Sequence, residues 1–173
     1  DRERAYYVSV YSDGEIDWNF WTYFDDITTI YTRYPDSTSS DDTLANGKTA
    51  TTKNVTALLD DLENDYSGTK WSDSKSYTSD EFGKGTGPQG FAYKLSDEVF
   101  GNLEAREVKD FDDLQVGDLI ELWDEDEYGV IVEIDGDDIY YAYVKSSEKI
   151  SWSGWIDVDD LDSDDTAYTR YPD

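Results

Sequence analysis

The sequence predicts an α+β fold in which two helices pack on an antiparallel sheet. Two amphipathic helical segments lie near the middle of the 173-residue chain, and a run of short strand-forming segments follows them. Aromatic residues make up 16% of the chain and supply large apolar surfaces, although acidic residues number 42 against 14 basic ones. We therefore expect an ordered, strongly acidic protein with one main domain.

Strand patterns come first along the chain. Residues 5–11 and 15–24 are rich in aromatic and β-branched residues, and a Ser-Asp-Gly turn signal separates them. A third, shorter strand is expected at 29–34, where it ends at Pro35. Residues 37–51 are small and polar, which indicates a linker or an exposed loop.

Two helices are expected next. The first, at 53–66, has apolar residues at i, i+3, i+4 and i+7 counted from Val55, which places them on one face. The second, at 88–100, begins with a proline, which needs no amide partner in a first helical turn, and ends before Gly101. Residues 69–87 between the helices are polar and glycine-rich, which indicates a long loop.

The C-terminal part predicts antiparallel strands joined by short turns. The Asp-Gly pair that begins at Asp135 is typical of a tight hairpin turn. The strands are expected at 119–123, 129–134, 139–144, 149–156 and 167–171.

Three residue types are missing from the chain: cysteine, histidine and methionine. Their absence excludes a disulfide, a thiolate nucleophile, an imidazole base and the usual ligands of zinc and haem. Because position 1 is not methionine, we expect a processed or excised chain. No apolar segment approaches the length of a membrane span, so membrane insertion is not expected.

The formal net charge of −28 repels phosphate, so we expect no nucleic-acid partner. A charge of this size suits a soluble protein in an extracellular setting or at the cell surface. An EF-hand loop starting at Asp157 would need Gly at its sixth position and Glu at its twelfth, but Asp162 and Tyr168 stand there. We therefore expect no cofactor and no tight metal site, and at most weak, diffuse calcium binding.

The most specific pattern is an internal repeat. The chain ends in Tyr-Thr-Arg-Tyr-Pro-Asp, and the same hexapeptide occupies positions 31–36. The similarity extends backwards at an offset of 134 residues, and a three-residue insertion near Asp162 shifts the offset to 137. Residues 5–36 are therefore predicted to be a partial second copy of residues 139–173. The matched residues include Tyr6, Tyr7, Ile16, Trp18 and Trp21, which pair with Tyr140, Tyr141, Ile150, Trp152 and Trp155.

A copy of only these strands cannot bury its own apolar face, because an isolated hairpin is marginally stable in water. Three partners remain open: the main domain of the same chain, a neighbouring chain by strand addition, and the adjacent unit of a tandem array. The repeated tryptophans, Trp152 and Trp155 among them, are expected to pack between the strands. The residues predicted to form the assembly surface are Tyr6, Tyr7, Ile16, Trp18, Trp21, Tyr31 and Tyr34.

Four stretches of the second half carry a family resemblance. They are the helical segment 53–66; Gly-Pro-Gln-Gly-Phe-Ala-Tyr-Lys-Leu-Ser-Asp at 87–97 with Val-Phe-Gly at 99–101; Phe-Asp-Asp-Leu-Gln-Val-Gly-Asp at 111–118; and the closing Tyr-Thr-Arg-Tyr-Pro. Through them residues 52–173 resemble secreted bacterial domains of the papain-like fold, close to the NlpC and CHAP cell-wall amidases and peptidases. The resemblance implies a papain-like domain.

The same resemblance implies that the catalytic residues are missing. In these families a cysteine begins the second helix and a histidine opens a later strand, whereas this chain has Pro88 and Tyr128 at the matching positions. A polar residue that orients the histidine follows on the next strand, where Tyr143 and Lys145 stand here. The resemblance therefore implies a degenerate cleft near Pro88, Gln89, Tyr128, Tyr143 and Lys145, without hydrolase activity.

We expect a non-enzymatic extracellular structural module, a unit of a self-assembling filament or of a tandem surface array. Residues 1–36 would join the units, residues 37–51 would be the linker, and residues 52–173 would form the degenerate domain. The main alternative is a domain that binds a cell-wall glycan or peptide without cleaving it. A carboxylate-only enzyme and an engineered acidic chain are further alternatives.

Overall fold

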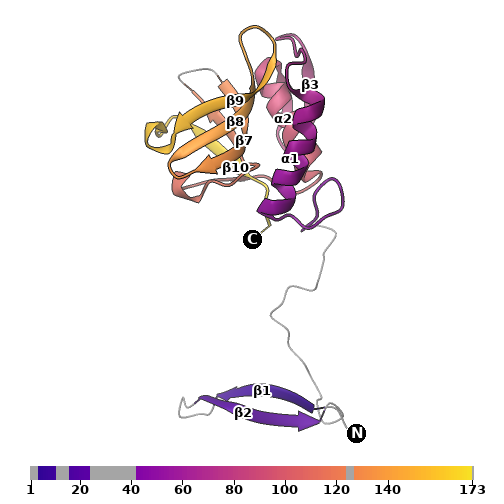
Figure 1. Ribbon diagram of the computed structural model, residues 1–173, viewed down its shortest axis with the longest axis vertical. Coiled ribbons are helices and arrows are strands. Elements are labelled where there is room, and N and C mark those ends of the chain that lie inside the picture. Colours follow the sequence, from indigo (N-terminus) through magenta and orange to yellow (C-terminus); the bar gives the residue numbers. More distant parts are fainter. Residues whose placement is uncertain (1–3, 11–15, 24–41, 124–126, 173) are drawn as a thin grey trace. The chain divides into compact units, whose positions relative to one another are not determined.

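The computed structural model describes residues 4–10, 16–23, 42–123 and 127–172 (Figure 1). The chain divides into two compact units, Asp1–Ser37 and Thr38–Asp173.

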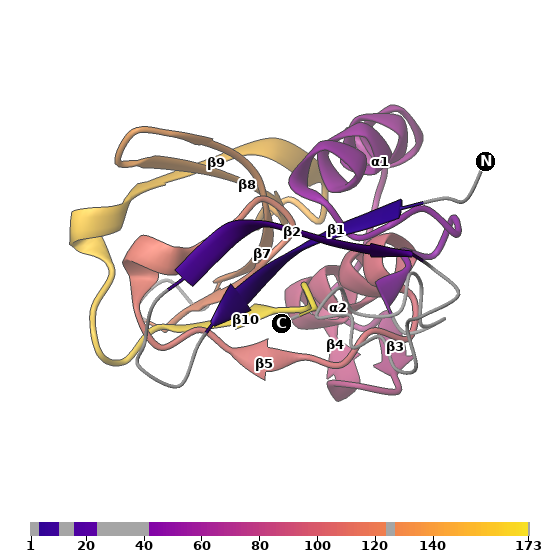
Figure 2. The same cartoon turned by 90° about the horizontal axis from the view of Figure 1, so that it is seen from below.

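The first unit contains an antiparallel hairpin of β1 (Arg4–Val10) and β2 (Ile16–Tyr23), drawn in indigo in Figure 2. The two strands match the segments predicted at 5–11 and 15–24 to within one residue. Tyr6 pairs with Trp21, and a bulge interrupts the ladder between Tyr7 and Ser9. The strand predicted at 29–34, with Tyr31 and Tyr34, lies outside the described residues.

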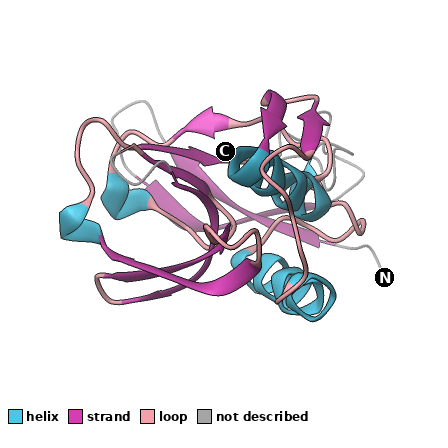
Figure 3. Cartoon of the chain, turned by 90° about the horizontal axis from the view of Figure 1, so that it is seen from above, coloured by secondary structure: helices cyan, strands magenta, loops and turns pink. Residues whose placement is uncertain are grey.

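The second unit is α+β, with two helices packed on an antiparallel sheet, as predicted. Figure 3 shows α1 (Thr52–Tyr66) and α2 (Gly87–Phe100) beside the curved sheet. The strand order is β5-β10-β6-β7-β8-β9, and every neighbouring pair is antiparallel. The strands are β5 (Arg106–Glu107), β6 (Leu119–Leu122), β7 (Glu127–Asp135), β8 (Asp138–Val144), β9 (Ile150–Asp157) and β10 (Thr166–Thr169).

Local sequence explains where the two helices begin and end. The Thr51 side chain caps α1 by accepting a hydrogen bond from the Asn54 amide at 3.4 Å. Pro88 lies in the first turn of α2, and Gly101, with a φ of 63°, ends that helix. No helix among the described residues is long and apolar enough to cross a membrane.

The segment 69–87, expected to be a loop, contains a second hairpin, so that prediction was wrong. The hairpin consists of β3 (Ser76–Ser79) and β4 (Gly83–Thr86), and it packs beside α2. Gly85 allows this hairpin to lie close to α2, because its backbone lies against the helix. A Cβ atom at Gly85 would lie 2.9 Å from the amide nitrogen of Gly90, so the close approach requires glycine.

Part of the segment predicted to be a linker packs onto the domain. Residues 42–51 form a tight turn closed by a bridge between Thr43 and Thr49. The turn places Leu44 in the core with 2% of its surface exposed. A single large apolar residue in a polar segment is a weak sequence pattern, but its burial stabilises the packing of this turn on the core.

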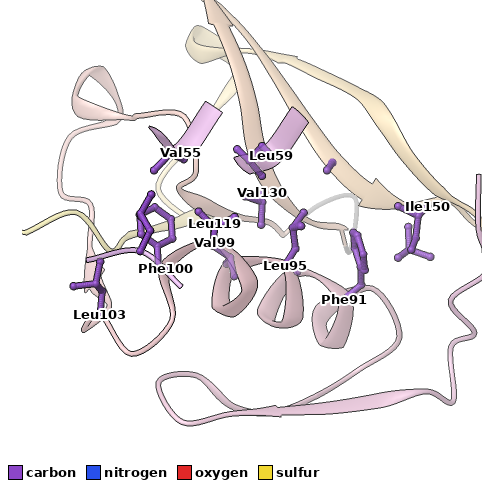
Figure 4. Close-up of a cluster of buried hydrophobic side chains, with 14 of the residues drawn as sticks. Val55, Leu59, Phe91, Leu95, Val99, Phe100, Leu103, Leu119, Val130 and Ile150 are labelled. Atoms are coloured by element: carbon purple, nitrogen blue, oxygen red, sulfur yellow. The ribbon is translucent and has the colours of Figure 1, made fainter. Parts of the chain in front are cut away.

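Each face of the sheet packs against a cluster of buried apolar residues. One face packs against the two helices (Figure 4), and the other is covered by the short 3₁₀ turns η3 (Phe111–Asp113) and η4 (Val158–Asp160) and their neighbours. Burial of both faces explains the long apolar runs in the C-terminal strands. The helix-side core includes Val55, Leu59, Phe91, Leu95, Val99, Phe100, Leu119 and Val130, and the opposite cluster consists of Ile120, Leu122, Ile131, Ile139, Tyr141 and Ala167.

Candidate functional site

The structure places the two predicted cleft tyrosines on opposite faces of the sheet. Tyr128 on β7 packs against the helix-side core, whereas Tyr143 on β8 packs against the opposite cluster. Tyr143 pairs with Gly129, the neighbour of Tyr128, and successive side chains of a strand point to opposite faces. The pair therefore does not share a cleft.

The other predicted cleft residues lie at the start of α2 and after β8. Pro88 and Gln89 are half-buried in the first turn of α2, beside the Gly87 carbonyl, which accepts a 2.8 Å hydrogen bond from the Trp71 indole. Lys145 is exposed after β8. The structure does not gather the five predicted positions into one site.

The hydroxyl group of Tyr128 is hydrogen-bonded, and that of Tyr143 is hard to ionise. Tyr128 donates a hydrogen bond to the Glu121 carboxylate. Burial, with a smaller effect of the Glu127 charge, raises the pKa of Tyr143. Neither group is suited to act as a base at neutral pH.

A buried polar site holds the C-terminal segment, and sequence analysis did not single it out. Its centre is Arg170, whose side chain is 1% exposed. The guanidinium Nη1 lies 2.6 Å from the Asp97 carboxylate, and Nε and Nη2 each donate a 2.7 Å hydrogen bond to the carbonyls of Leu103 and Gly101. We call the residues that receive this segment the C-terminal socket: Ser96, Asp97, Gly101, Leu103 and Val116.

Asp97 is the acceptor on which the socket depends. Besides Arg170, it accepts hydrogen bonds from Tyr77 at 3.1 Å and from Ser79 at 3.0 Å. Burial, followed by the negative charge of Asp97, raises the pKa of Tyr77, so its hydroxyl remains a donor. A buried ion pair needs such additional hydrogen bonds, because desolvation of both charges opposes its formation.

Tyr171 completes the contact between the C-terminal segment and the socket. Its hydroxyl donates a 2.6 Å hydrogen bond to the Val116 carbonyl, and its ring meets Phe100 edge-on at 5.3 Å. Burial strongly raises the pKa of this hydroxyl, which therefore stays protonated. A cavity of about 810 Å³ adjoins the socket, lined by Asp42, Thr43, Leu44, Ala45, Gly101, Asn102, Leu103, Glu104, Arg106, Arg170, Tyr171 and Pro172.

Asp118 is a buried carboxylate near the same segment. Its side chain is fully buried, and its Oδ2 accepts a 2.8 Å hydrogen bond from the Gln115 amide. Burial raises the pKa of Asp118 to about 7, against weaker opposing effects of Thr169, Gln115 and Arg106. Near neutral pH this group therefore exists in both protonation states.

Two tryptophans form the other candidate surface. Trp123 is 66% exposed and Trp155 is 53% exposed, so the prediction that Trp155 packs between strands was wrong. Trp152 does pack, with its ring 6.4 Å from that of Phe91. A cavity of about 300 Å³ lies between the exposed indoles, lined by Leu122, Trp123, Tyr141, Trp155, Ile156, Asp160, Asp162 and Asp165.

Among the described residues, no three acidic side chains are grouped in a way that could hold a metal ion. Weak calcium binding remains a prediction from the charge. Comparisons of the chain with family models, with curated proteins and with solved structures found no match.

Proposed function

We propose that the protein is a non-enzymatic extracellular structural module, joined to a second copy of its domain through residues 1–36. The joined copies form a filament or a tandem surface array. The observation that carries this proposal is the pairing register of two hairpins, one in each unit of the chain.

The β1–β2 hairpin has the register of the β8–β9 hairpin. Each of the six residue pairs of β8 and β9 lies 134 positions after a pair of β1 and β2. Tyr140 opposite Trp155 thus corresponds to Tyr6 opposite Trp21, and the bulge falls at the same place. This agreement in strand bounds, pairs and bulge supports the interpretation of residues 5–36 as a copy of residues 139–173.

The β8–β9 hairpin depends on the domain around it. β8 pairs with β7 and contacts α2, and Ala142, Val144 and Ile150 lie in the helix-side core. Two strands alone cannot supply such a surface. A second copy of the domain would supply the missing partner surface. Identical units joined head to tail form open arrays when the rotation does not close.

The chemistry of the chain favours a structural role over a hydrolase. Without cysteine or histidine, the positions marked by the papain-like resemblance hold Pro88 and Tyr128, which supply neither a thiolate nor an imidazole. A papain-like scaffold that has lost its reaction is therefore part of this proposal.

The test compares the full chain with a variant that lacks residues 1–36, by light scattering and electron microscopy. We expect the full chain to associate in a concentration-dependent way and the shortened chain, which keeps the whole described core, to stay monomeric. Two monomeric proteins up to millimolar concentration would contradict the proposal.

A second candidate function is binding of a cell-wall glycan, which the exposed indoles of Trp123 and Trp155 favour. Indole faces stack on sugars, and nearby carboxylates accept hydrogen bonds from hydroxyl groups. Titration of the full chain with muropeptides and glycans, followed by tryptophan fluorescence, tests this function. Trp155→Ala should abolish any saturable change, whereas Ser153→Ala, at an exposed neighbour, should not.

A further inference from the structure

We propose that the C-terminal socket is a docking site for the hexapeptide at residues 31–36 of a second copy of this chain. This inference rests on the proposed function and specifies the contact that joins two copies. The incoming hexapeptide takes the place that the described residues 168–172 of the C-terminal hexapeptide hold, so the two identical segments exchange.

Two side chains of the C-terminal hexapeptide donate hydrogen bonds to the socket. Arg170 bonds to Asp97, Gly101 and Leu103, and Tyr171 bonds to Val116. Arg33 and Tyr34 hold the corresponding positions in residues 31–36. The second hexapeptide therefore brings the same donors at the same spacing.

The socket is selective for arginine. Its acceptors are two backbone carbonyls and one carboxylate, arranged around a planar guanidinium from which water is excluded. A lysine ammonium cannot match three acceptors in this planar arrangement. The chain has five arginines, and only Arg33 and Arg170 stand in a Thr-Arg-Tyr-Pro sequence.

The last segment is easier to exchange than the β8–β9 hairpin. β10 makes three residue pairs with β6 and two with β5, whereas the β8–β9 hairpin is held in the sheet by six pairs between β8 and β7. A Cβ atom at Gly154 would lie 2.4 Å from the Tyr141 ring, and the matching residue of β2 is Phe20. The β1–β2 hairpin therefore differs from β8–β9 at a packed position, whereas the hexapeptide is identical.

Thermal unfolding of full-length variants tests whether Arg33 enters the socket. Arg170→Ala removes the resident guanidinium and leaves Asp97 buried. Adding Arg33→Ala should lower the melting temperature further, on the order of 10 °C, because no second guanidinium then fills the socket. Adding Arg4→Ala, the matched control outside the hexapeptide, should not. If Arg33→Ala lowers the melting temperature by the same amount in the unaltered protein and in the Arg170→Ala variant, the docking proposal is wrong.

The dependence of the melting temperature on protein concentration shows whether Arg33 comes from the same copy or from a second copy. If Arg33 comes from a second copy, the melting temperature of Arg170→Ala rises with protein concentration, and that of Arg33→Ala/Arg170→Ala does not. A rescue by Arg33 that is independent of concentration would mean docking within one chain, which overturns the role of the second copy. This outcome differs from failure of the proposed function, which appears as monomers in light scattering.

If Arg170→Ala does not fold, crosslinking tests the docking proposal instead. The chain has no cysteine, so Asp36→Cys/Asn102→Cys introduces the only two thiols. Asn102 lines the cavity that Pro172 also lines. A short bis-maleimide should join different copies into covalent dimers and longer species. The control Asp36→Cys/Asp60→Cys, with its second thiol on the exposed side of α1, should give few of these. Equal yields, or only internal crosslinks, would overturn the proposal.

Discussion

The protonation of one buried side chain links the stability of the domain to pH. Asp118 has a pKa of about 7 in the folded protein, against an ordinary value of 3.8, because burial disfavours its charge. The folded state therefore binds a proton more tightly than the unfolded state does. The resulting stabilisation is complete below pH 4 and is lost as the pH rises through 7.

Asp118→Asn should remove this dependence. Between pH 5 and pH 8, the free energy of unfolding of the unaltered protein should fall more than that of Asp118→Asn, by a difference on the order of 2 kcal/mol. Urea unfolding at several pH values measures it. Asp113→Asn, at an exposed aspartate, controls for the change in net charge. If both variants follow the pH profile of the unaltered protein, Asp118 is not the group responsible.

Among the residues of the candidate site, sequence analysis found the hexapeptide but not the role of its arginine. A charged residue near the end of a chain ordinarily predicts an exposed side chain. Arg170 is buried because Asp97 and two carbonyls meet there from segments about 70 residues earlier. The sequence signal for this role was that Arg33 and Arg170 occupy the same position of an identical hexapeptide.

At the level of the elements, Tyr141 shows how three strands are fitted together. Its ring lies against Gly129 on β7 and Gly154 on β9, and its hydroxyl donates a 2.9 Å hydrogen bond to Glu127. The two glycines leave the space that the buried ring occupies. Neither glycine marks a turn; each allows close packing.

Gly154→Ala should therefore destabilise the domain. Its Cβ atom would lie 2.4 Å from the Tyr141 ring, so the ring or the strand must shift. We expect the free energy of unfolding to fall by about 1–3 kcal/mol, the usual effect of overpacking a core. Chemical denaturation measures it, with Ser153→Ala as a control at an exposed position of the same strand. An unchanged unfolding midpoint for Gly154→Ala would show that the sheet adapts freely.

The sequence predicted an element correctly where its hydrophobic pattern was strong and missed it where the pattern was weak. Helical periodicity and strand alternation placed both helices and most strands, because these patterns reflect burial directly. The β3–β4 hairpin was missed because Gly85 packs against α2 through its backbone, which leaves no apolar pattern. The proposed cleft was assembled by resemblance, which cannot show that Tyr128 and Tyr143 lie on opposite faces.

For the whole molecule, the net charge of −28 sets the response to ions. Like charges repel one another more strongly in the compact state than in the unfolded chain, and salt screens this repulsion over about 10 Å at 0.1 M. The described residues contain no cluster of acidic side chains that would hold one ion tightly. The interaction with cations should therefore be diffuse.

We expect the melting temperature to rise by several degrees from low salt to 1 M sodium chloride, because screening reduces the repulsion. Calcium and magnesium at equal concentration should have similar effects. Differential scanning calorimetry measures both. A melting temperature independent of salt would contradict the role of repulsion, and a much larger effect of calcium than of magnesium would indicate a specific site.

The position of β10 has a mechanical consequence. β10 lies between β5 and β6, and the hexapeptide begins with the last two residues of β10 and continues into the socket. If copies are joined as proposed, the hexapeptide of the incoming copy takes this place, and tension along the array passes through it. A strand held on both sides and pulled along its axis loads its hydrogen bonds together, and the ion pair that the incoming Arg33 would make with Asp97 bears load at the same time. Such a junction resists tension because several hydrogen bonds along its length bear the force in parallel.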